Sequence, residues 1–355
     1  MFLVFAMAGV LWGIGALMGA PRSTRITMIG VLYLGVLVIQ LTLPDGSPLR
    51  MATGESPALW LIIGGFAALI FAYRRGLRLL QDRADHARAA DQPDAPRKGF
   101  SDTELNRYAR HIVLREIGGP GQSLLKEAKV LVIGAGGLGA PALQYLAAAG
   151  VGTIGVIDDD RVENANLQRQ VIHKDQSIGT PKVFSAQAEM TAQNPHVTVR
   201  PYHRRLTEEI ASDLFADYDL ILDGTDNFDT RYLANRVAAE QGIPLISGAL
   251  SQWEGQLSVF DPARGAPCYQ CIFPQAPAAE LAPSCAEAGV LGPLPGVIGA
   301  MMATEAIKII TDAGTVLRGQ MVIYDALYGE SRIIAISPRP DCPVCGGARG
   351  HAPAA

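Results

Sequence analysis

Long apolar runs without charged residues dominate the first 80 positions. Three of them follow one another, at about 2–19, 26–43 and 57–73. Each is close to the roughly 20 residues that a helix needs to cross the hydrocarbon core of a bilayer. A cleaved signal peptide is disfavoured because no basic residue precedes the first run. We therefore expect a transmembrane anchor of three helices over residues 1–80; buried helices of a soluble protein are the alternative.

Positive charges flank these runs unevenly. Arg22 and Arg25 lie between the first and second runs, and a basic cluster follows the third run: Arg74, Arg75, Arg78 and Arg83. The segment 44–57, between the second and third runs, carries only Arg50 as a basic residue. Because basic loops tend to stay on the cytoplasmic side, the pattern predicts a multi-pass protein of the cytoplasmic membrane. Its N-terminus would lie outside, and the chain after residue 80 would lie in the cytoplasm.

Beyond the anchor, short apolar runs alternate with longer amphipathic segments. The segment 81–100 is rich in Ala, Asp, Arg and Pro and is typical of a flexible linker. Ser101 and Glu104 have the spacing of a capping box, which opens a helix. Helices are then expected between strands near 130–133, 153–158, 197–201, 218–223 and 244–249. This alternation predicts a mainly parallel α/β sheet in a domain over 101–347, with a tail at 348–355.

Composition agrees with this division of the chain. Hydrophobic residues make up 49% of the 355 positions, which is high for a soluble enzyme, and the excess lies before residue 74. A later apolar stretch, 297–310, has helical spacing, and we expect it to pack in the core or between subunits. The formal net charge of −4 and the lack of a basic patch give no support for nucleic-acid binding.

A glycine-rich turn follows the first expected strand of the α/β domain. The chain reads Gly134-Ala-Gly136-Gly137-Leu-Gly139 there, and the next strand ends at Asp158. In such a unit the first glycine permits the turn and the last lets helix and strand pack closely, while Gly136 and Gly137 let the backbone approach a phosphate. The helix N-terminus offers free N–H groups to the anion. Asp158 is placed to accept hydrogen bonds from ribose hydroxyls. Taken alone, this unit would first suggest NAD.

Polar and cationic residues beyond this unit favour a triphosphate. Asn166, Arg169 and Lys182 follow the ribose-binding strand end, and Arg and Lys are strong donors to phosphate. The alternative is that Arg169 and Lys182 are ordinary surface charges. Asp226 follows another apolar strand, so its carboxylate can face the phosphates and hold Mg²⁺; it could instead cap the next helix. Together these residues favour ATP with Mg²⁺.

Five cysteines form two pairs and one single residue. The pairs are Cys268-x-x-Cys271 and Cys342-x-x-Cys345. Two such pairs can supply the four thiolates of a closed, tetrahedral zinc site even when they are far apart in sequence. We expect a structural Zn²⁺ that ties the C-terminal end to the region around Cys271; a redox role for either pair is the alternative. The remaining thiol, Cys285, is either catalytic or an incidental small hydrophobe.

These motifs together resemble the MoeB/ThiF/HesA group of E1-like adenylyltransferases, and most closely its MoeB branch, the molybdopterin-synthase adenylyltransferases. The resemblance extends over about 101–347 and is carried by GAGGLG, DDDRVENANLQRQ, GTPK, DGTDN, both cysteine pairs and GVLGPLPGVIGAMMATEAIK. It implies a Rossmann-like α/β fold with an ATP site. By motif position, the ATP-site residues of the family fall on Gly137, Asp158, Asn166, Arg169, Lys182, Asp226 and Asn227. An arginine that the family lends from the neighbouring subunit of a homodimer falls on Arg110.

The same resemblance implies a reaction and a partner. Members of this group activate the C-terminal glycine of small ubiquitin-like sulfur-carrier proteins. The family's usual arginine before EGQ is replaced here, since the chain reads Ser251-Gln252-Trp253, and this bears on carrier specificity. In related proteins the cysteine at the position of Cys285 can take part in sulfur transfer or acyl linkage. We expect the sulfur to come from a separate donor protein, because no rhodanese-like domain is appended.

We therefore expect a membrane-tethered adenylyltransferase that forms an acyl-adenylate on a carrier of the MoaD type and releases pyrophosphate. Activation of a ThiS-type carrier in thiamine biosynthesis and a non-catalytic membrane scaffold stay open as alternatives. An NAD-dependent oxidoreductase is disfavoured by the cationic residues and by the sequence Thr225-Asp226-Asn227.

Overall fold

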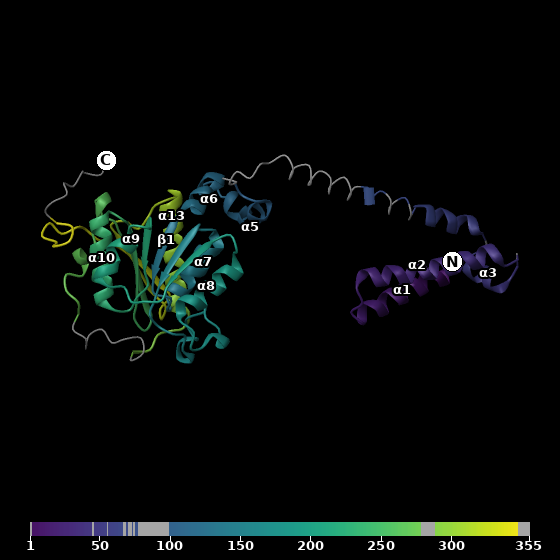
Figure 1. Ribbon diagram of the computed structural model, residues 1–355, viewed down its shortest axis with the longest axis horizontal. Coiled ribbons are helices and arrows are strands. Elements are labelled where there is room, and N and C mark those ends of the chain that lie inside the picture. The colour runs from purple at the N-terminus through teal and green to yellow at the C-terminus, as the bar shows by residue number, and fades with distance from the viewer. Residues whose placement is uncertain are drawn as a thin grey trace. The chain divides into compact units, whose positions relative to one another are not determined.

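The chain divides into two compact units, Met1–Lys98 and Gly99–Ala355 (Figure 1). The computed structural model describes residues 2–44, 46–54, 56–66, 69, 73, 75–76, 99–277 and 288–346. Most of the expected linker, the tail at 348–355 and Cys285 lie outside the described residues.

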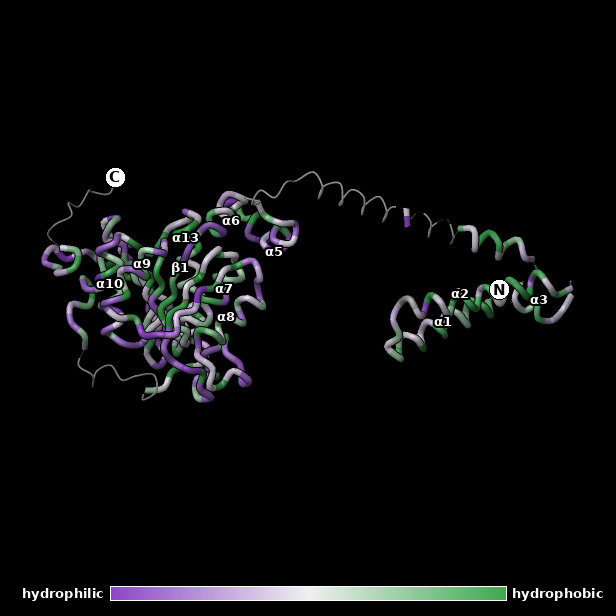
Figure 2. Tube along the Cα trace, viewed as in Figure 1, coloured by the Kyte–Doolittle hydropathy of each residue, from purple (hydrophilic) through white to green (hydrophobic). Residues whose placement is uncertain are grey.

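Apolar helices make up the described part of the first unit (Figure 2). They are α1 (Phe2–Leu17), α2 (Arg22–Thr42), the short α3 (Pro48–Thr53) and a further apolar helix over Pro57–Phe66. Large side chains on α1 and α2 are exposed, among them Phe2, Val31 and Val38. Among the described residues of this unit, α2 alone is long and apolar enough to cross a membrane, since α1 has 16 residues. The three transmembrane helices expected from the sequence stay a prediction.

The second helix begins earlier than the apolar pattern predicts. The sequence places Arg22 and Arg25 in a loop between two spans, whereas both lie in the first turn of α2. The guanidinium of Arg25 donates to the carbonyl of Ala20 at 2.8 Å and lies 5.7 Å from the ring centroid of Trp12. Because a long basic side chain can fold along an apolar surface while its charged group reaches polar partners, a charge does not mark the helix boundary here.

A short helix lies between α2 and the third apolar run, where the sequence suggested only a loop. Ser47 caps α3 by accepting the N–H of Arg50 at 3.3 Å. Gln40, which is 1% exposed, donates to the carbonyls of Arg50 and Gly54 at 2.9 and 2.6 Å. Both carbonyls lie at the C-terminal end of α3, so these hydrogen bonds hold α3 against α2.

An eight-stranded sheet forms the centre of the described part of the second unit, in the order β3-β2-β1-β4-β5-β6-β7-β8. The five parallel strands confirm the prediction: β1 (Lys129–Ile133), β2 (Thr153–Ile157), β3 (Thr198–Tyr202), β4 (Leu220–Asp223) and β5 (Leu245–Leu250). Three antiparallel strands that were not predicted extend the sheet beyond β5: β6 (Glu254–Phe260), β7 (Gln320–Asp325) and β8 (Glu330–Ala335). The sheet is therefore mixed.

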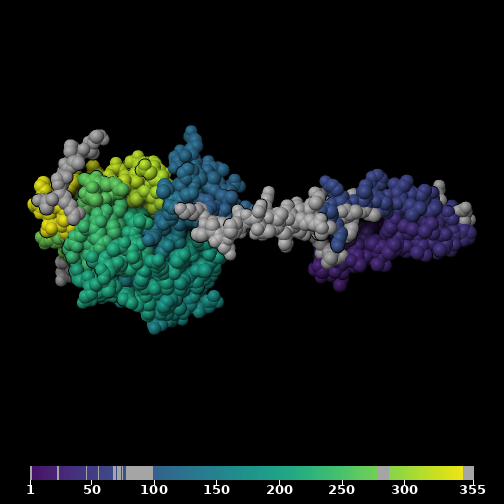
Figure 3. Space-filling view, turned by 45° about the horizontal axis from the view of Figure 1, so that its top comes forward, coloured from purple at the N-terminus to yellow at the C-terminus, as the bar shows by residue number. Residues whose placement is uncertain are grey.

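Helices cover both faces of this sheet (Figure 1). One face packs against α7 (Gly139–Ala149), α8 (Lys182–Gln193) and α13 (Pro293–Thr311), and the other against α9 (Glu208–Phe215) and α10 (Phe228–Gln241). Further helical segments are α5 (Asp102–Ile112), α6 (Gly118–Glu127), α11 (Tyr269–Ile272) and the 3-10 turns η1 (Asn164–Asn166), η2 (Asp175–Ser177) and η3 (Pro262–Arg264). The predicted capping box of Ser101 and Glu104 opens α5, and α5 and α6 lie at the surface of the unit (Figure 3).

Helix α13 confirms that the stretch 297–310 packs in the core. Ile298 and Met302 are fully buried. A Cβ on Gly255 would lie 2.3 Å from Cγ1 of Ile298, and one on Gly248 would lie 2.7 Å from Sδ of Met302. These glycines of β6 and β5 therefore let the helix lie directly on the sheet. Although α13 is long and apolar enough to cross a membrane, 50% of its apolar window is buried inside the unit, as expected of a core helix.

Candidate active site

A cleft of about 1370 Å³ opens at the carboxyl ends of β1, β2 and β4. Ligands of open α/β sheets bind at this edge. The cleft is lined by six of the residues that the sequence predicts for the nucleotide site: Gly137, Asp158, Arg169, Lys182, Asp226 and Asn227. Separate segments of the chain thus bring the expected residues together in one place.

The glycine loop after β1 depends on the missing Cβ atoms. Gly134 has a φ of +92°, a conformation that other residues rarely adopt. A Cβ on Gly139 would lie 1.9 Å from the carbonyl oxygen of Gly134, so this glycine lets α7 start against the loop. A Cβ on Gly137 would approach Pro295 of α13 at 3.1 Å. The loop leads into the N-terminal end of α7, where free N–H groups stabilise an anion.

Asp158 supports the glycine loop in addition to facing the cleft. One carboxylate oxygen accepts the N–H of Ala135 at 2.7 Å, and the other accepts the N–H of Asp160 at 2.8 Å. Burial raises the pKa of Asp158, and the positive charge of Lys182 opposes this rise. Each carboxylate oxygen can accept more than one hydrogen bond, so Asp158 keeps the capacity to accept the ribose hydroxyls that the sequence predicts.

Lys182 and Arg169 supply positive charge to the cleft. Lys182 begins α8, is 4% exposed, and has its ammonium 2.7 Å from a carboxylate oxygen of Asp160. The alternative that Lys182 is an ordinary surface charge is therefore wrong. Arg169 donates to the side-chain carbonyl of Asn166, in η1, at 2.9 Å. Asn166 is absent from the described residues that line the cleft, but it holds Arg169, which does line it.

Two arginines that were not predicted from the sequence also line the cleft. Arg204 and Arg205 follow the end of β3 after one intervening residue. Consecutive basic residues after a predicted strand are a signal that could have identified them, because strand ends meet at one edge of a parallel sheet. They increase the positive charge that a polyphosphate would meet.

The loop after β4 gives two neighbouring residues different roles. Asn227 caps α10, because its side-chain oxygen accepts the N–H of Thr230 at 2.9 Å. Helix capping is the alternative role considered for Asp226, and the structure assigns it to Asn227 instead. Asp226 is exposed in the cleft. Its carboxylate can therefore reach a cation or a ligand there.

A buried charge network beneath this loop does not follow from the sequence. Asp223 and Arg231 are 1% and 5% exposed, with 3.5 Å between carboxylate oxygen and guanidinium nitrogen. Arg231 also donates to the carbonyl of Thr225 and, at 2.8 Å, to that of Gly248. Asp223 accepts the hydroxyl of Thr225 at 2.6 Å. The network ties the loop to β4 and β5. Asp223 could have been noticed as a carboxylate at a strand end, but the place of Arg231 is defined only by the fold.

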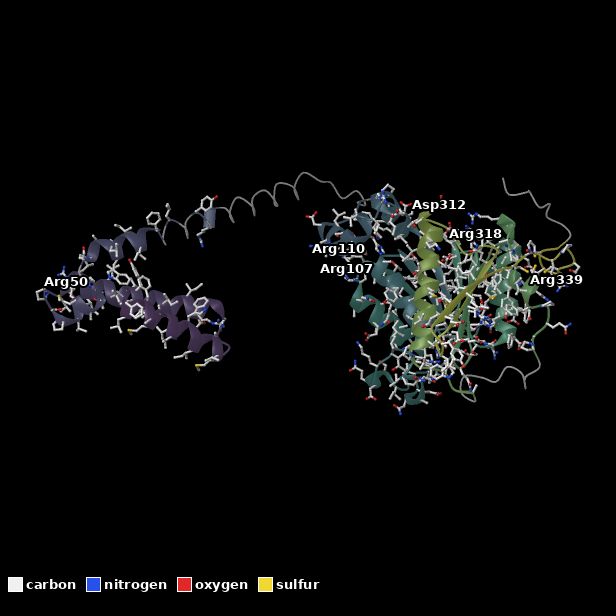
Figure 4. The ribbon with its side chains drawn as sticks, turned by 180° about the vertical axis from the view of Figure 1, so that it is seen from behind. Arg50, Arg107, Arg110, Asp312, Arg318 and Arg339 are labelled. Atoms are coloured by element: carbon white, nitrogen blue, oxygen red, sulfur yellow. The ribbon has the colours of Figure 1, made fainter. Side chains whose placement is uncertain are left out.

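Arg110 lies away from the cleft of its own chain. It is on α5 with Arg107 (Figure 4), and neither is among the described residues that line the cleft. Both line a second pocket of about 430 Å³, together with Tyr145 of α7 and Thr304 of α13. A single chain therefore does not bring Arg110 to the other site residues. The remaining candidate, Cys285, lies outside the described residues.

Both cysteine pairs meet in one cluster. The four Sγ atoms lie within 4.8 Å of one another, with 3.5 Å between Cys268 and Cys342 and 3.3 Å between Cys271 and Cys345. A tetrahedral site with Zn–S bonds of about 2.3 Å spaces its sulfurs by about 3.8 Å, so the donor set fits zinc. Burial opposes ionisation of Cys342, but hydrogen bonds from the backbone of Cys345 and Val344 outweigh it and lower the pKa of Cys342 to about 7.

Comparisons with known proteins agree with this geometry. The model of the ThiF family matches residues 108–344. The SAMP-activating enzyme E1 of Haloferax volcanii is 48% identical over 244 residues, which cover 69% of this chain and 90% of that enzyme. The sulfur carrier protein adenylyltransferase of Thermus thermophilus is 48% identical over 247 residues, covering 68% of this chain and 91% of that protein. A crystal structure of E. coli MccB with ATP has the same fold, with a TM-score of 0.58 and 23% identity over 71% of this chain and 77% of MccB.

Proposed function

Because this chain belongs to the ThiF family, we propose that it uses ATP to adenylate the C-terminal glycine of a small ubiquitin-like sulfur-carrier protein. Two relatives at 48% identity, covered over 90% and 91% of their length, are a SAMP-activating enzyme and a sulfur carrier protein adenylyltransferase. A carrier of the MoaD type, used in molybdenum cofactor biosynthesis, is the first candidate. A ThiS-type carrier is the alternative.

The composition of the cleft is the observation that carries this proposal. A glycine loop at a helix N-terminus, cations that include Arg169 and Lys182, and the exposed Asp226 line one cleft. Backbone N–H groups alone suffice for a diphosphate, whereas a triphosphate carries more charge and gains from cationic donors. The cleft also has a volume, about 1370 Å³, that can admit a peptide tail beside a nucleotide.

In the proposed reaction the terminal carboxylate of the carrier attacks the α-phosphorus of ATP. The bond between this phosphorus and the bridging oxygen breaks, pyrophosphate leaves with that oxygen, and an acyl-adenylate remains. No general base is needed because the carboxylate is already ionised at neutral pH. Asp158 orients the ribose, while Arg169 and Lys182 neutralise charge on the phosphates as it shifts to pyrophosphate. Asp226 would face Mg²⁺, which supplies further neutralisation when bound.

The second subunit of a homodimer would complete the site. Arg110 lies on the surface helix α5 and outside its own cleft, so it is free to serve a neighbouring chain. A guanidinium added from a partner would contribute charge to the same phosphates.

Sulfur from a separate donor protein would then attack the acyl carbon of the adenylate, and AMP would leave as the bond from that carbon to the phosphate oxygen breaks. Cys285 is the candidate for a transient covalent link, since the other four cysteines form the cluster. Zinc bound by that cluster would be structural, because all four coordination positions are filled by protein thiolates and none is open to substrate.

The first unit would hold the enzyme at the cytoplasmic membrane. Large apolar side chains are exposed along α1 and α2, and α2 has the length and composition of a span. The uneven basic residues of the sequence favour an N-terminus outside and a cytoplasmic enzyme unit, where ATP is available.

Replacing Asp226 by Ala tests the proposed chemistry. We expect carrier-dependent ATP–pyrophosphate exchange to fall by at least about 100-fold, because the charge that positions Mg²⁺ is lost. Exchange is measured with radiolabelled pyrophosphate, and zinc content is measured on the same preparation and should not change.

A matched control is Asp229→Ala, which removes an exposed carboxylate three residues further along that does not line the cleft. This variant should keep wild-type exchange. Undiminished exchange in Asp226→Ala would reject the role of that residue, and a larger thermal shift with NAD than with ATP would reject the nucleotide assignment.

A further inference from the structure

A buried histidine lies directly behind the glycine loop, and the reaction described above assigns it no part. His173 is 5% exposed and lies between η1 and η2. Its Nε2 is 2.9 Å from the carbonyl oxygen of Ala135, and its Nδ1 is 2.9 Å from Oγ of Ser185. Both ring nitrogens are therefore engaged by groups that are themselves buried, since Ala135 and Ser185 are 0% and 4% exposed.

Ala135, the second residue of the glycine loop, is held through both of its backbone polar groups. Its N–H donates to Asp158 at 2.7 Å, and its carbonyl accepts from His173. Because a trans peptide is planar, with C=O and N–H pointing in opposite directions, fixing this carbonyl also fixes the N–H of Gly136. That N–H points away from His173, and Gly136 lines the cleft. The histidine thus sets the direction of a backbone donor of the anion site.

The other ring nitrogen connects the loop to a second phosphate-facing element. Ser185 lies in the first turn of α8, which begins with Lys182. The imidazole therefore bridges the glycine loop and the helix whose first residue places an ammonium in the cleft. A rigid ring whose two nitrogens point in different directions can fix both contacts at once.

The two contacts also fix the tautomer. The carbonyl of Ala135 can only accept, so Nε2 carries the proton, and the neutral Nδ1 accepts from the hydroxyl of Ser185. Burial lowers the pKa of His173, the bond to Ala135 opposes this, and Lys182 lowers it further against the opposing carboxylates of Asp158 and Glu189. Burial therefore favours the neutral ring, in which Nδ1 accepts the hydroxyl of Ser185.

We infer that His173 is a positioning residue for nucleotide binding, which orients the Ala135–Gly136 peptide toward the phosphates and sets its spacing from Lys182. The inference rests on the proposed function in so far as the ligand is ATP. His173 touches no substrate, so its effect must appear in the affinity for the nucleotide before it appears in any later step.

Two substitutions of the full chain separate positioning from packing. His173→Phe keeps a ring of similar shape but removes both hydrogen bonds, and we expect Kd for ATP and KM for ATP in exchange to rise about tenfold, the equivalent of one or two hydrogen bonds. His173→Gln offers an amide N–H near the position of Nε2 and should recover affinity to within about threefold of wild type. Ser185→Ala removes one contact and should have an intermediate effect.

The thermal midpoint without ligand is measured alongside the affinities, with His196→Phe as a control at an exposed histidine outside the cleft. A lower midpoint with unchanged Kd for ATP in His173→Phe, or no recovery in His173→Gln, would overturn the inference and leave His173 as packing. Isothermal titration with ATP needs no carrier protein. If the chain binds ATP but catalyses no exchange, the proposed function is rejected. The Kd values of the variants for ATP still decide the role of His173.

Discussion

Asp226 and Asn227 are neighbours in the cleft but have different roles, and substitutions can separate these roles. Asn227 caps α10, so Asn227→Ala should lower the free energy of unfolding by about 1 kcal/mol. Asn227→Asp keeps a side-chain oxygen and should retain most of the stability. Urea unfolding measures both, and Asp226→Ala serves as the control because Asp226 is not the cap. Equal stability of Asn227→Ala and wild type would show that the cap contributes nothing.

His173 should make stability depend on pH on the acid side. Burial lowers its pKa below the usual 6.5, so on acidification the unfolded chain takes up the proton first. The contribution of His173 to the free energy of unfolding is therefore fully present above about pH 6.5, and it is lost as pH falls through the lower pKa of His173 in the folded chain. We expect urea midpoints to decline less steeply between about pH 7 and pH 5 in His173→Gln than in wild type. Identical slopes would contradict a buried neutral ring.

At the scale of elements, the strands that are buried on both faces of the sheet could be predicted from the sequence. Each of β1, β2 and β4 has at least four buried residues, and such strands appear as continuous apolar runs. All six residues of β8 are exposed, so no periodic apolar pattern distinguishes this edge strand from a loop. It forms because β7 offers it an antiparallel partner. The two strands form a local hairpin joined by residues 326–329, but the apolar pattern alone does not show this pairing.

The residues of the site likewise divide into those that could be predicted from the sequence and those that could not. Glycines and charges at strand ends carry their chemistry locally, so Gly137, Asp158, Lys182 and Asp226 could be predicted. The contacts of Asp223 with Arg231, and of His173 with Ala135, depend on how separate elements pack. The motif position of Arg110 could be read from the resemblance, but its distance from the cleft is a property of the folded chain.

The short helix α11 links the cysteine cluster to the cleft. It runs from Tyr269 to Ile272, begins directly after Cys268 and contains Cys271, and Tyr269 lines the cleft. We expect about one Zn²⁺ per chain, and we expect Cys345→Ser to lose it and to lower Tm by on the order of 10 °C. Metal analysis and thermal unfolding measure these. Cys285→Ser is the matched control, and loss of zinc in that variant instead would contradict the cluster.

At the scale of the whole molecule, the two units have opposite surface chemistry. The first exposes large apolar side chains along its described helices, whereas the second has a large buried apolar cluster on each face of its sheet. Exposed apolar surface of this extent destabilises a protein in water and is suited to lipid. Every described residue that lines the cleft belongs to the second unit. The catalytic activity should therefore depend on the second unit alone, and attachment to the membrane on the first.

Deleting residues 1–98 tests this separation. The shortened chain keeps the capping box that opens α5 and the whole sheet, so we expect it to fold, to leave the membrane fraction, and to exchange ATP with pyrophosphate nearly as fast as the full chain. Cell fractionation and the exchange assay measure these two properties. The control is a full-length variant with Leu34→Arg and Val38→Arg, at two positions exposed on α2. It should also leave the membrane fraction, because charges at the centre of a span are costly. A full chain that stays in the supernatant without detergent would contradict the anchor, and a soluble but inactive shortened chain would show that the first unit contributes to catalysis.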